Sequence, residues 1–179
     1  MQTLLLPELV IPDEVTETPF GNITVPGVSV PQRMMVIEPQ LIKQLIDAAR
    51  LATETYYSGV PGIDFAVGAA CIMADDGEGE IFTACNSEMG ILNAGMCAER
   101  ALLHYVVSKG FRRIKYLVVT TANRKKEINL RSPCGLCRQT IAEFSDDNTL
   151  ILIDHDQPGM LCDVVDINRF LPYRYRLQL

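Results

Sequence analysis

The spacing of apolar and polar residues predicts three helices. From residue 38 or 39 to about residue 56, apolar side chains recur at helical spacing with charged residues between them, which is typical of an amphipathic helix. Residues 97–108 have a helical pattern that includes small residues able to pack closely. A shorter helix is predicted to begin beside Cys134 and to end near Phe144. Two of the three helices therefore start at a cysteine.

Strand-like runs alternate with these helices. Residues 65–74 and 80–86 predict two strands, and the turn-forming residues 75–79 between them predict an antiparallel hairpin. Residues 115–122 and 149–153 predict two further strands. The order helix, two antiparallel strands, helix, strand, helix and strand predicts a layered α/β domain with a mixed sheet.

Residues 1–37 differ from the rest of the chain in their prolines. Proline at positions 7, 12, 19, 26 and 31 leaves no room for a helix of useful length, so we predict an extended arm followed by a domain that spans residues 38–179. Disordered segments are usually poor in apolar residues, so we expect this arm to pack, either along its own core or on a neighbouring subunit. Its apolar anchors are Ile11, Phe20, Ile23, Val25, Val28 and Val30.

Charge and composition narrow the class of partner. The 179 residues carry a formal net charge of −6, and the sequence pI is near 4.9, so the surface should repel the phosphate backbone of a nucleic acid polymer. A nucleoside or another small molecule fits better as a substrate. The first residues include no basic side chain and too short an apolar run for a signal peptide, and no stretch reaches the roughly 18 apolar residues of a membrane span. We therefore expect a cytoplasmic protein that binds no membrane.

Two short motifs supply residues for metal chemistry. Glu99 follows Cys97 by two residues, and Cys134 and Cys137 form a C-x-x-C pair after a proline. Three thiolates suit Zn²⁺, and a catalytic zinc keeps its fourth position open for water, beside which Glu99 would carry protons. A C-x-x-C pair alone is a weak signal. The combination of C-x-E and P-C-x-x-C, however, matches the zinc deaminase signature, with cysteine in place of its usual histidine.

Two alternatives use the same cysteines differently. A binding module with a closed structural zinc would take a fourth ligand such as Cys85, and a redox or packing pair would hold no metal. We expect Cys71 and Cys85 to be buried structural thiols, because free cysteine packs as a small apolar residue. His104 lies about two helical turns after Cys97, and His155 lies between two acids, so neither is expected to bind the metal.

Taken together, the motifs resemble those of the small cytidine deaminases that use three cysteines. The resemblance runs from about residue 40 to the C-terminus. It implies a three-layer α/β/α sandwich with a mixed five-strand sheet, whose last strand or helix lies in residues 161–172. It also implies hydrolytic deamination of cytidine or deoxycytidine by a homotetramer. The matching stretches are Phe65-Ala66-Val67-Gly68-Ala69-Ala70, Cys85-Asn86-Ser87-Glu88, Cys97-Ala98-Glu99-Arg100 and Ser132-Pro133-Cys134-Gly135-Leu136-Cys137-Arg138-Gln139.

The resemblance also implies roles for single residues. Zn²⁺ would be held by the three motif cysteines, and Glu99 would move protons between water and the base. The expected substrate contacts are Phe65 near the pyrimidine, Asn86 and Glu88 at the ribose hydroxyls, and the backbone of Ala98 at the base edge. From the residues alone, the Asn-x-Glu segment fits a solvated turn better than a binding site, and the phenylalanine fits a core position better than a pocket; the resemblance reverses both interpretations.

Two arginines directly follow the motifs. Arg100 and Arg138 are predicted to donate hydrogen bonds to the ligand sulfurs, as groups around a metal's ligands commonly do, although either would also fit as a surface charge.

One departure from the family concerns the pocket wall. The Tyr57-Ser58 pair is separated from the Phe-x-Val-Gly stretch by residues 59–64, and Met89 and Leu92 differ from the usual residues, so we expect a reshaped wall. The closest rival is a blasticidin-type deaminase, whose C-terminal segment is similar to Phe170-Leu171-Pro172 but which lacks the Asn-x-Glu pair. Which cytosine nucleoside is the substrate stays open on the sequence.

Overall fold

The chain divides into two compact units, Met1–Glu38 and Pro39–Leu179, one residue away from the expected boundary. The computed structural model describes residues 1–18, 21–25, 27–91, 94–122, 132–157 and 162–175. Each unit is described by itself below. Within these residues no helix is both long enough and apolar enough to cross a bilayer.

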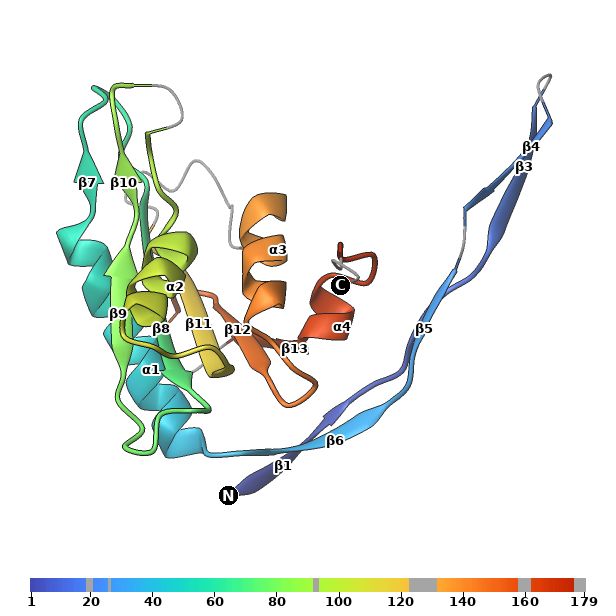
Figure 1. Ribbon diagram of the computed structural model, residues 1–179, viewed down its shortest axis with the longest axis horizontal. Helices are drawn as coiled ribbons and strands as arrows, with labels where there is room; N and C mark the ends of the chain where they lie inside the picture. Colours follow the sequence, from blue (N-terminus) through green and yellow to red (C-terminus); the bar gives the residue numbers. More distant parts are fainter. Residues whose placement is uncertain (19–20, 26, 92–93, 123–131, 158–161, 176–179) are drawn as a thin grey trace. The chain divides into compact units, whose positions relative to one another are not determined.

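The first unit is a long antiparallel β-ribbon (Figure 1). Three consecutive strand pairs build it: β1 (Gln2–Leu6) with β6 (Arg33–Ile37), β2 (Leu9–Ile11) with β5 (Val28–Val30), and β3 (Glu14–Thr18) with β4 (Gly21–Val25). Pro7, Pro12 and Pro31 lie between these pairs, where their missing N–H groups interrupt no ladder. The sequence predicted an extended segment but not this pairing.

The predicted anchors of the arm differ in exposure. Val30 is buried, whereas Ile11 is 37% exposed, and Leu5 and Met34, which pair across β1 and β6, are 51% and 61% exposed. Phe20 lies outside the described residues, and so do the side chains of Ile23 and Val25. A two-stranded ribbon with exposed apolar side chains is marginal in water by itself.

The second unit contains a mixed five-strand sheet, which confirms the predicted fold class. The strands are β8 (Ala66–Met73), β9 (Phe82–Cys85), β11 (Ile114–Ala122), β12 (Leu150–Asp154) and β13 (Cys162–Asp166). Their order is β13-β12-β11-β8-β9, with β11 and β12 parallel and every other neighbouring pair antiparallel. The segment that was expected to hold either a strand or a helix holds both, because α4 (Ile167–Phe170) follows β13 directly.

Helices cover both faces of this sheet (Figure 1). Helix α1 (Pro39–Ala52) packs on one face, while α2 (Ala98–Ser108) and α3 (Gly135–Glu143) lie on the other face. Successive strand residues point to opposite faces, so Ala69, Cys71 and Met73 of β8 join the core beneath α2. On the α1 side a Cβ at Gly68 would overlap the carbonyl oxygen of Ala49, so only glycine allows this close approach.

The first helix ends earlier than the sequence predicted. Residues Thr53–Thr55 form a 3₁₀ turn, and after Tyr56 comes the short strand β7 (Tyr57–Ser58), which pairs in parallel with β10 (Ser87–Glu88). The last apolar position of the predicted helix, Ala52, is also the last residue of α1, and the polar residues that follow it form the 3₁₀ turn. This pairing brings the Tyr-Ser segment beside the Asn-x-Glu segment.

Candidate active site

Three cysteine sulfurs converge where α2 and α3 begin. Cys97 and Cys134 are the N-caps of these two helices, and Cys137 lies in the first turn of α3. The three Sγ atoms all lie within 4.8 Å of one another, and those of Cys134 and Cys137 are 3.4 Å apart. Free backbone N–H groups and the positive ends of two helix dipoles point to this place, so it favours negatively charged sulfur.

The donor set fits a zinc ion. Four-coordinate zinc with Zn–S bonds of about 2.3 Å puts its sulfurs about 3.8 Å apart, so these three thiolates need only small movements to bind it. The pKa of the Cys97 thiol is lowered to about 7, because Cys137 hydrogen-bonds to its sulfur and Cys134 and the charge of Arg100 act in the same direction against the cost of burial. The pKa of the Cys137 thiol is raised by its hydrogen bond with Cys97 and by burial, so of these two thiols Cys97 loses its proton first. Thiolates are the form in which cysteine binds zinc.

The four-sulfur alternative is not supported within the described residues. The sulfur of Cys85 accepts a hydrogen bond from Thr55 at 3.6 Å, beside the end of α1, and is not part of the metal cluster. Cys85 is half-buried, while Cys71 is buried as expected, and burial raises the pKa of its thiol to about 12. His104 is exposed and His155 pairs with Asp163 at 3.1 Å, so neither histidine belongs to the cluster.

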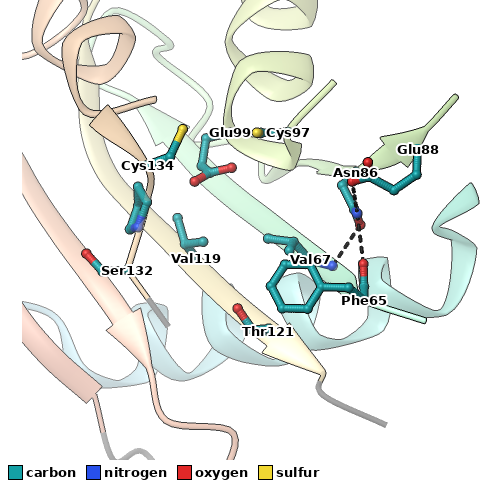
Figure 2. Close-up of a pocket in the computed structure, with 11 residues that line it drawn as sticks. Phe65, Val67, Asn86, Glu88, Cys97, Glu99, Val119, Thr121, Ser132 and Cys134 are labelled. Carbon is teal, nitrogen blue, oxygen red and sulfur yellow. Dashed lines mark hydrogen bonds between the residues drawn. The ribbon is translucent and has the colours of Figure 1, made fainter. Parts of the chain in front are cut away.

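Glu99 lies beside the sulfurs and is almost completely buried. It occupies the second position of α2 and is 3% exposed (Figure 2). Burial raises the pKa of its carboxyl group, while its own backbone N–H and the Cys137 thiol act in the opposite direction. The carboxyl group therefore binds a proton more readily than an exposed glutamate does.

A pocket of about 250 Å³ opens in front of this centre (Figure 2). Its floor comes from strands β8 and β11, which contribute alternate side chains that point away from α1. Val67, Val119 and Thr121 were not predicted as pocket residues. The sequence did contain a signal for Val67, because side chains alternate along a strand and Val67 follows Phe65 by two residues. The lining residues are Phe65, Val67, Asn86, Glu88, Cys97, Glu99, Val119, Thr121, Ser132, Pro133 and Cys134.

Asn86 organises the end of the pocket away from the cysteines. Its side-chain oxygen accepts a hydrogen bond from the Val67 amide at 2.8 Å, and its Nδ2 donates to the Phe65 carbonyl at 2.8 Å and to Glu88 Oε1 at 3.1 Å (Figure 2). Asn86 is only 2% exposed, and both of its amide hydrogens are engaged. It therefore holds the Glu88 carboxylate in place at this end of the pocket.

The longer connection before Phe65 lies next to this end. The Gly59 amide donates to the Glu88 carbonyl at 2.7 Å, and the Tyr56 hydroxyl donates to Asp64 at 2.7 Å, which closes the loop 59–64 on itself. Met89 is 42% exposed, and Leu92 lies outside the described residues. The loop of residues 59–64 is thus attached to the segment that carries Asn86 and Glu88.

The prediction for Arg138 needs a correction. Its guanidinium donates to Ser132 Oγ at 2.7 Å, to the Pro133 carbonyl at 3.0 Å and to the Phe170 carbonyl at 3.3 Å, and it stacks on the Phe170 ring. None of these bonds reaches a sulfur, because the side chain extends toward the loop that precedes Cys134. Arg138 therefore fixes the backbone of a ligand, and Arg100 acts on Cys97 through its charge.

Comparison with known proteins identifies the family. A mixed α/β domain with three cysteines beside a buried glutamate is the arrangement of a zinc-dependent deaminase. The family model for the cytidine and deoxycytidylate deaminase zinc-binding region matches residues 40–153, so the chain belongs to this family. The match includes all three cysteines and Glu99.

Individual relatives agree with this assignment. A cytidine deaminase of Sporosarcina psychrophila is 41% identical over 103 residues, which are 58% of this chain and 69% of the relative. That of Halalkalibacterium halodurans is 34% identical over 130 residues, or 73% of this chain and 90% of the relative. The crystal structure of cytidine deaminase from Burkholderia pseudomallei is 27% identical with a TM-score of 0.60 and covers 74% of this chain and 98% of its own.

Proposed function

We propose that the protein removes the amino group of cytidine, deoxycytidine or both by hydrolysis of its bond to C4, and releases uridine or deoxyuridine and ammonia. One observation carries this proposal: a buried glutamate lies beside three converging sulfurs, in a pocket whose other end presents the Asn86–Glu88 pair. The family and its named relatives support the same reaction.

The glutamate performs the proton transfers. Zinc held by Cys97, Cys134 and Cys137 would supply a water whose pKa is lowered toward about 7. Glu99 accepts a proton as the water oxygen bonds to C4 of the base, and it delivers that proton to N3. A second proton, from the new hydroxyl group, passes through Glu99 to the amino group, which then leaves as ammonia. The net reaction adds one water and releases one ammonia.

The remaining pocket residues orient the nucleoside. The Ala98 amide is one of the N–H groups in the first turn of α2 that have no partner within the helix, but Ala98 is fully buried and does not line the pocket, so its contact with the base edge stays a prediction. Phe65 is available to the flat face of the pyrimidine, and the Asn86–Glu88 pair to the ribose hydroxyls. Glu88→Gln should therefore raise the KM for cytidine without changing zinc content, and free cytosine should be a poor substrate.

An ammonia-release assay separates this function from its rivals. Zinc-loaded protein is offered cytidine, deoxycytidine, blasticidin S, cytosine, adenosine and guanine. Turnover of cytidine or deoxycytidine supports the proposal. Preference for blasticidin S would favour the blasticidin-type alternative, and failure with every compound would favour a non-catalytic zinc module.

We also propose that the protein assembles as a homotetramer. The ribbon of residues 1–38 offers exposed apolar side chains for self-association, among them Leu5, Val10 and Met34, and closed symmetric assemblies are the usual outcome. The acidic chain is not expected to bind a nucleic acid polymer. An active monomer in light scattering at the assay concentration would contradict the proposal.

A further inference from the structure

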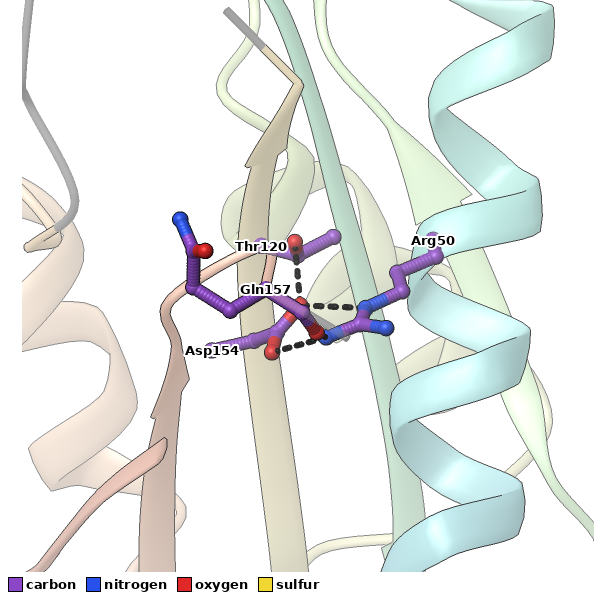
Figure 3. Close-up of polar contacts among 4 residues, drawn as sticks. All are labelled: Arg50, Thr120, Asp154 and Gln157. Carbon is purple, nitrogen blue, oxygen red and sulfur yellow. Dashed lines mark hydrogen bonds and ion pairs between the residues drawn. The ribbon is translucent and has the colours of Figure 1, made fainter. Parts of the chain in front are cut away.

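A buried polar network lies on the face of the sheet opposite the pocket (Figure 3). Arg50 of α1 contacts Asp154 at the end of β12 through two hydrogen bonds of 2.7 Å, from Nε to Oδ2 and from an Nη to Oδ1. Thr120 of β11 donates its hydroxyl hydrogen to Asp154 Oδ2 at 2.8 Å. Thr120 is fully buried and Asp154 is 1% exposed, so the carboxylate is neutralised and bonded within the fold.

The same arginine also reaches the loop after β12. Its guanidinium donates to the Gln157 carbonyl at 2.8 Å (Figure 3). One side chain on α1 is therefore linked to β12, to the following loop and, through the carboxylate, to β11. Arg50 and Asp154 are 104 positions apart in the chain, and Thr120 and Asp154 are 34 positions apart.

Thr120 lies between two residues that line the pocket. Val119 and Thr121 line the pocket on one face of β11, so the side chain of Thr120 points to the opposite face, toward α1. The partner of Thr120 on β8 is Gly68, whose missing Cβ allows α1 to pack closely there. The network is thus one strand thickness away from the pocket floor.

The backbone pairing of β11 explains why this link matters. Toward β12, the register of β11 covers residues 116–119 and ends with Val119 opposite Ile153. Toward β8, the register continues through Thr121 to Ala122. The end of β11 therefore extends past its ladder with β12, and the side-chain hydrogen bond from Thr120 to Asp154 continues the connection on that side.

We propose that Arg50, Asp154 and Thr120 are positioning residues for the substrate pocket, because they fix the end of β11 that carries Val119 and Thr121. This inference rests on the proposed function for its kinetic consequence. Glu99 and the cysteines belong to α2, α3 and their N-caps, so a displaced β11 weakens nucleoside binding more than it slows the chemical step.

Thr120→Val tests the hydrogen bond while keeping the shape of the side chain. We expect the KM for cytidine to rise roughly three- to tenfold with kcat within about twofold of the parent, since small displacements of binding groups have such costs. Thr120→Ser keeps the hydroxyl and should remain near the parent. A role in packing alone predicts the reverse order, with Ser worse than Val.

Thr149→Val is the matched control. Thr149 is also fully buried, and its hydroxyl donates to the Ile114 carbonyl at 2.7 Å, at the other end of β11, and accepts from the Asp146 amide at 3.0 Å. The substitution should lower Tm at least as much as Thr120→Val does and leave KM unchanged. If Thr120→Val does not fold, Arg50→Lys keeps the charge but loses the two-bond geometry, and it should raise KM in the same way.

Amide hydrogen exchange gives a readout that does not depend on the substrate. In Thr120→Val, exchange of residues 119–121 should be faster than in the parent, and in Thr149→Val it should not. Parental KM and unchanged exchange at these residues in Thr120→Val would overturn the inference. An inactive zinc-loaded parent would instead refute the proposed function, and the exchange comparison would still decide the inference.

Discussion

Asn86→Asp changes one buried atom from a donor to an acceptor and so tests how the pocket is built. The parent side chain donates to the Phe65 carbonyl and to Glu88, and it accepts from the Val67 amide. The introduced carboxyl group can still accept from Val67. When it is ionised, however, it places an oxygen against the Phe65 carbonyl and against the Glu88 carboxylate.

The size of the effect follows from these contacts. Two hydrogen bonds of about 0.5–1.5 kcal/mol each are lost in a site that is only 2% exposed, and facing acceptors add a repulsive contribution. We expect the free energy of unfolding to fall by about 2–4 kcal/mol, or Tm to fall by roughly 5–15 °C for a chain of this size. The deficit should shrink in acid, because a protonated carboxyl group regains one donor.

Denaturant unfolding of zinc-loaded protein measures this difference. Asn168→Asp is the matched control, because Asn168 also donates to a carboxylate, that of Asp147 at 3.1 Å, but in an exposed bond. It should cost less than about 1 kcal/mol. If Asn86→Asp were as stable as this control near neutral pH, the arrangement of Asn86 described above would be wrong.

Three further predictions address packing, metal and assembly. Gly68→Ala should lower the free energy of unfolding by about 3 kcal/mol, because the new methyl group meets the backbone of α1. The control Gly77→Ala should change it little, because nothing lies within 4 Å of the added atom. Equal denaturation midpoints for the two variants would contradict the close packing at Gly68. Chelation should remove one zinc per chain, lower Tm and abolish activity, and added zinc should restore Tm and activity. Metal analysis showing no zinc in active protein would refute the metal site. Removal of residues 1–38 should weaken the assembly and leave zinc bound, and light scattering showing the parental mass would exclude a role for the arm.

The sequence was most informative where chemistry and local structure coincide. The sequence predicted that helices begin at Cys97 and beside Cys134, and the structure makes these two residues the N-caps of α2 and α3. Sequence patterns predicted β8, β9, β11 and β12 and the helices α1, α2 and α3 to within a few residues, whereas the short strands β7 and β10 were missed. The end of α1 was predicted near Tyr56, but the α-helix ends at Ala52 and the polar residues Thr53–Thr55 form a 3₁₀ turn.

Contacts between distant residues were beyond the sequence. Nothing local indicates that Arg138 bonds to the carbonyl of Phe170, 32 residues away, in preference to a nearby sulfur. The same holds for Asn86 and the Phe65 carbonyl, 21 residues apart, and for Arg50 and Asp154. In the arm, the spacing of prolines excluded a helix but contained no information on which strand pairs with which.

The most direct test of the central claim compares the parent with Glu99→Gln, both loaded with one zinc per chain, for conversion of cytidine to uridine. A neutral amide cannot accept a proton from water, so the variant should bind zinc and fold as the parent does but turn over at least about 10³-fold more slowly. Near-parental turnover by the zinc-loaded variant would contradict the proposed role of Glu99 and the mechanism built on it.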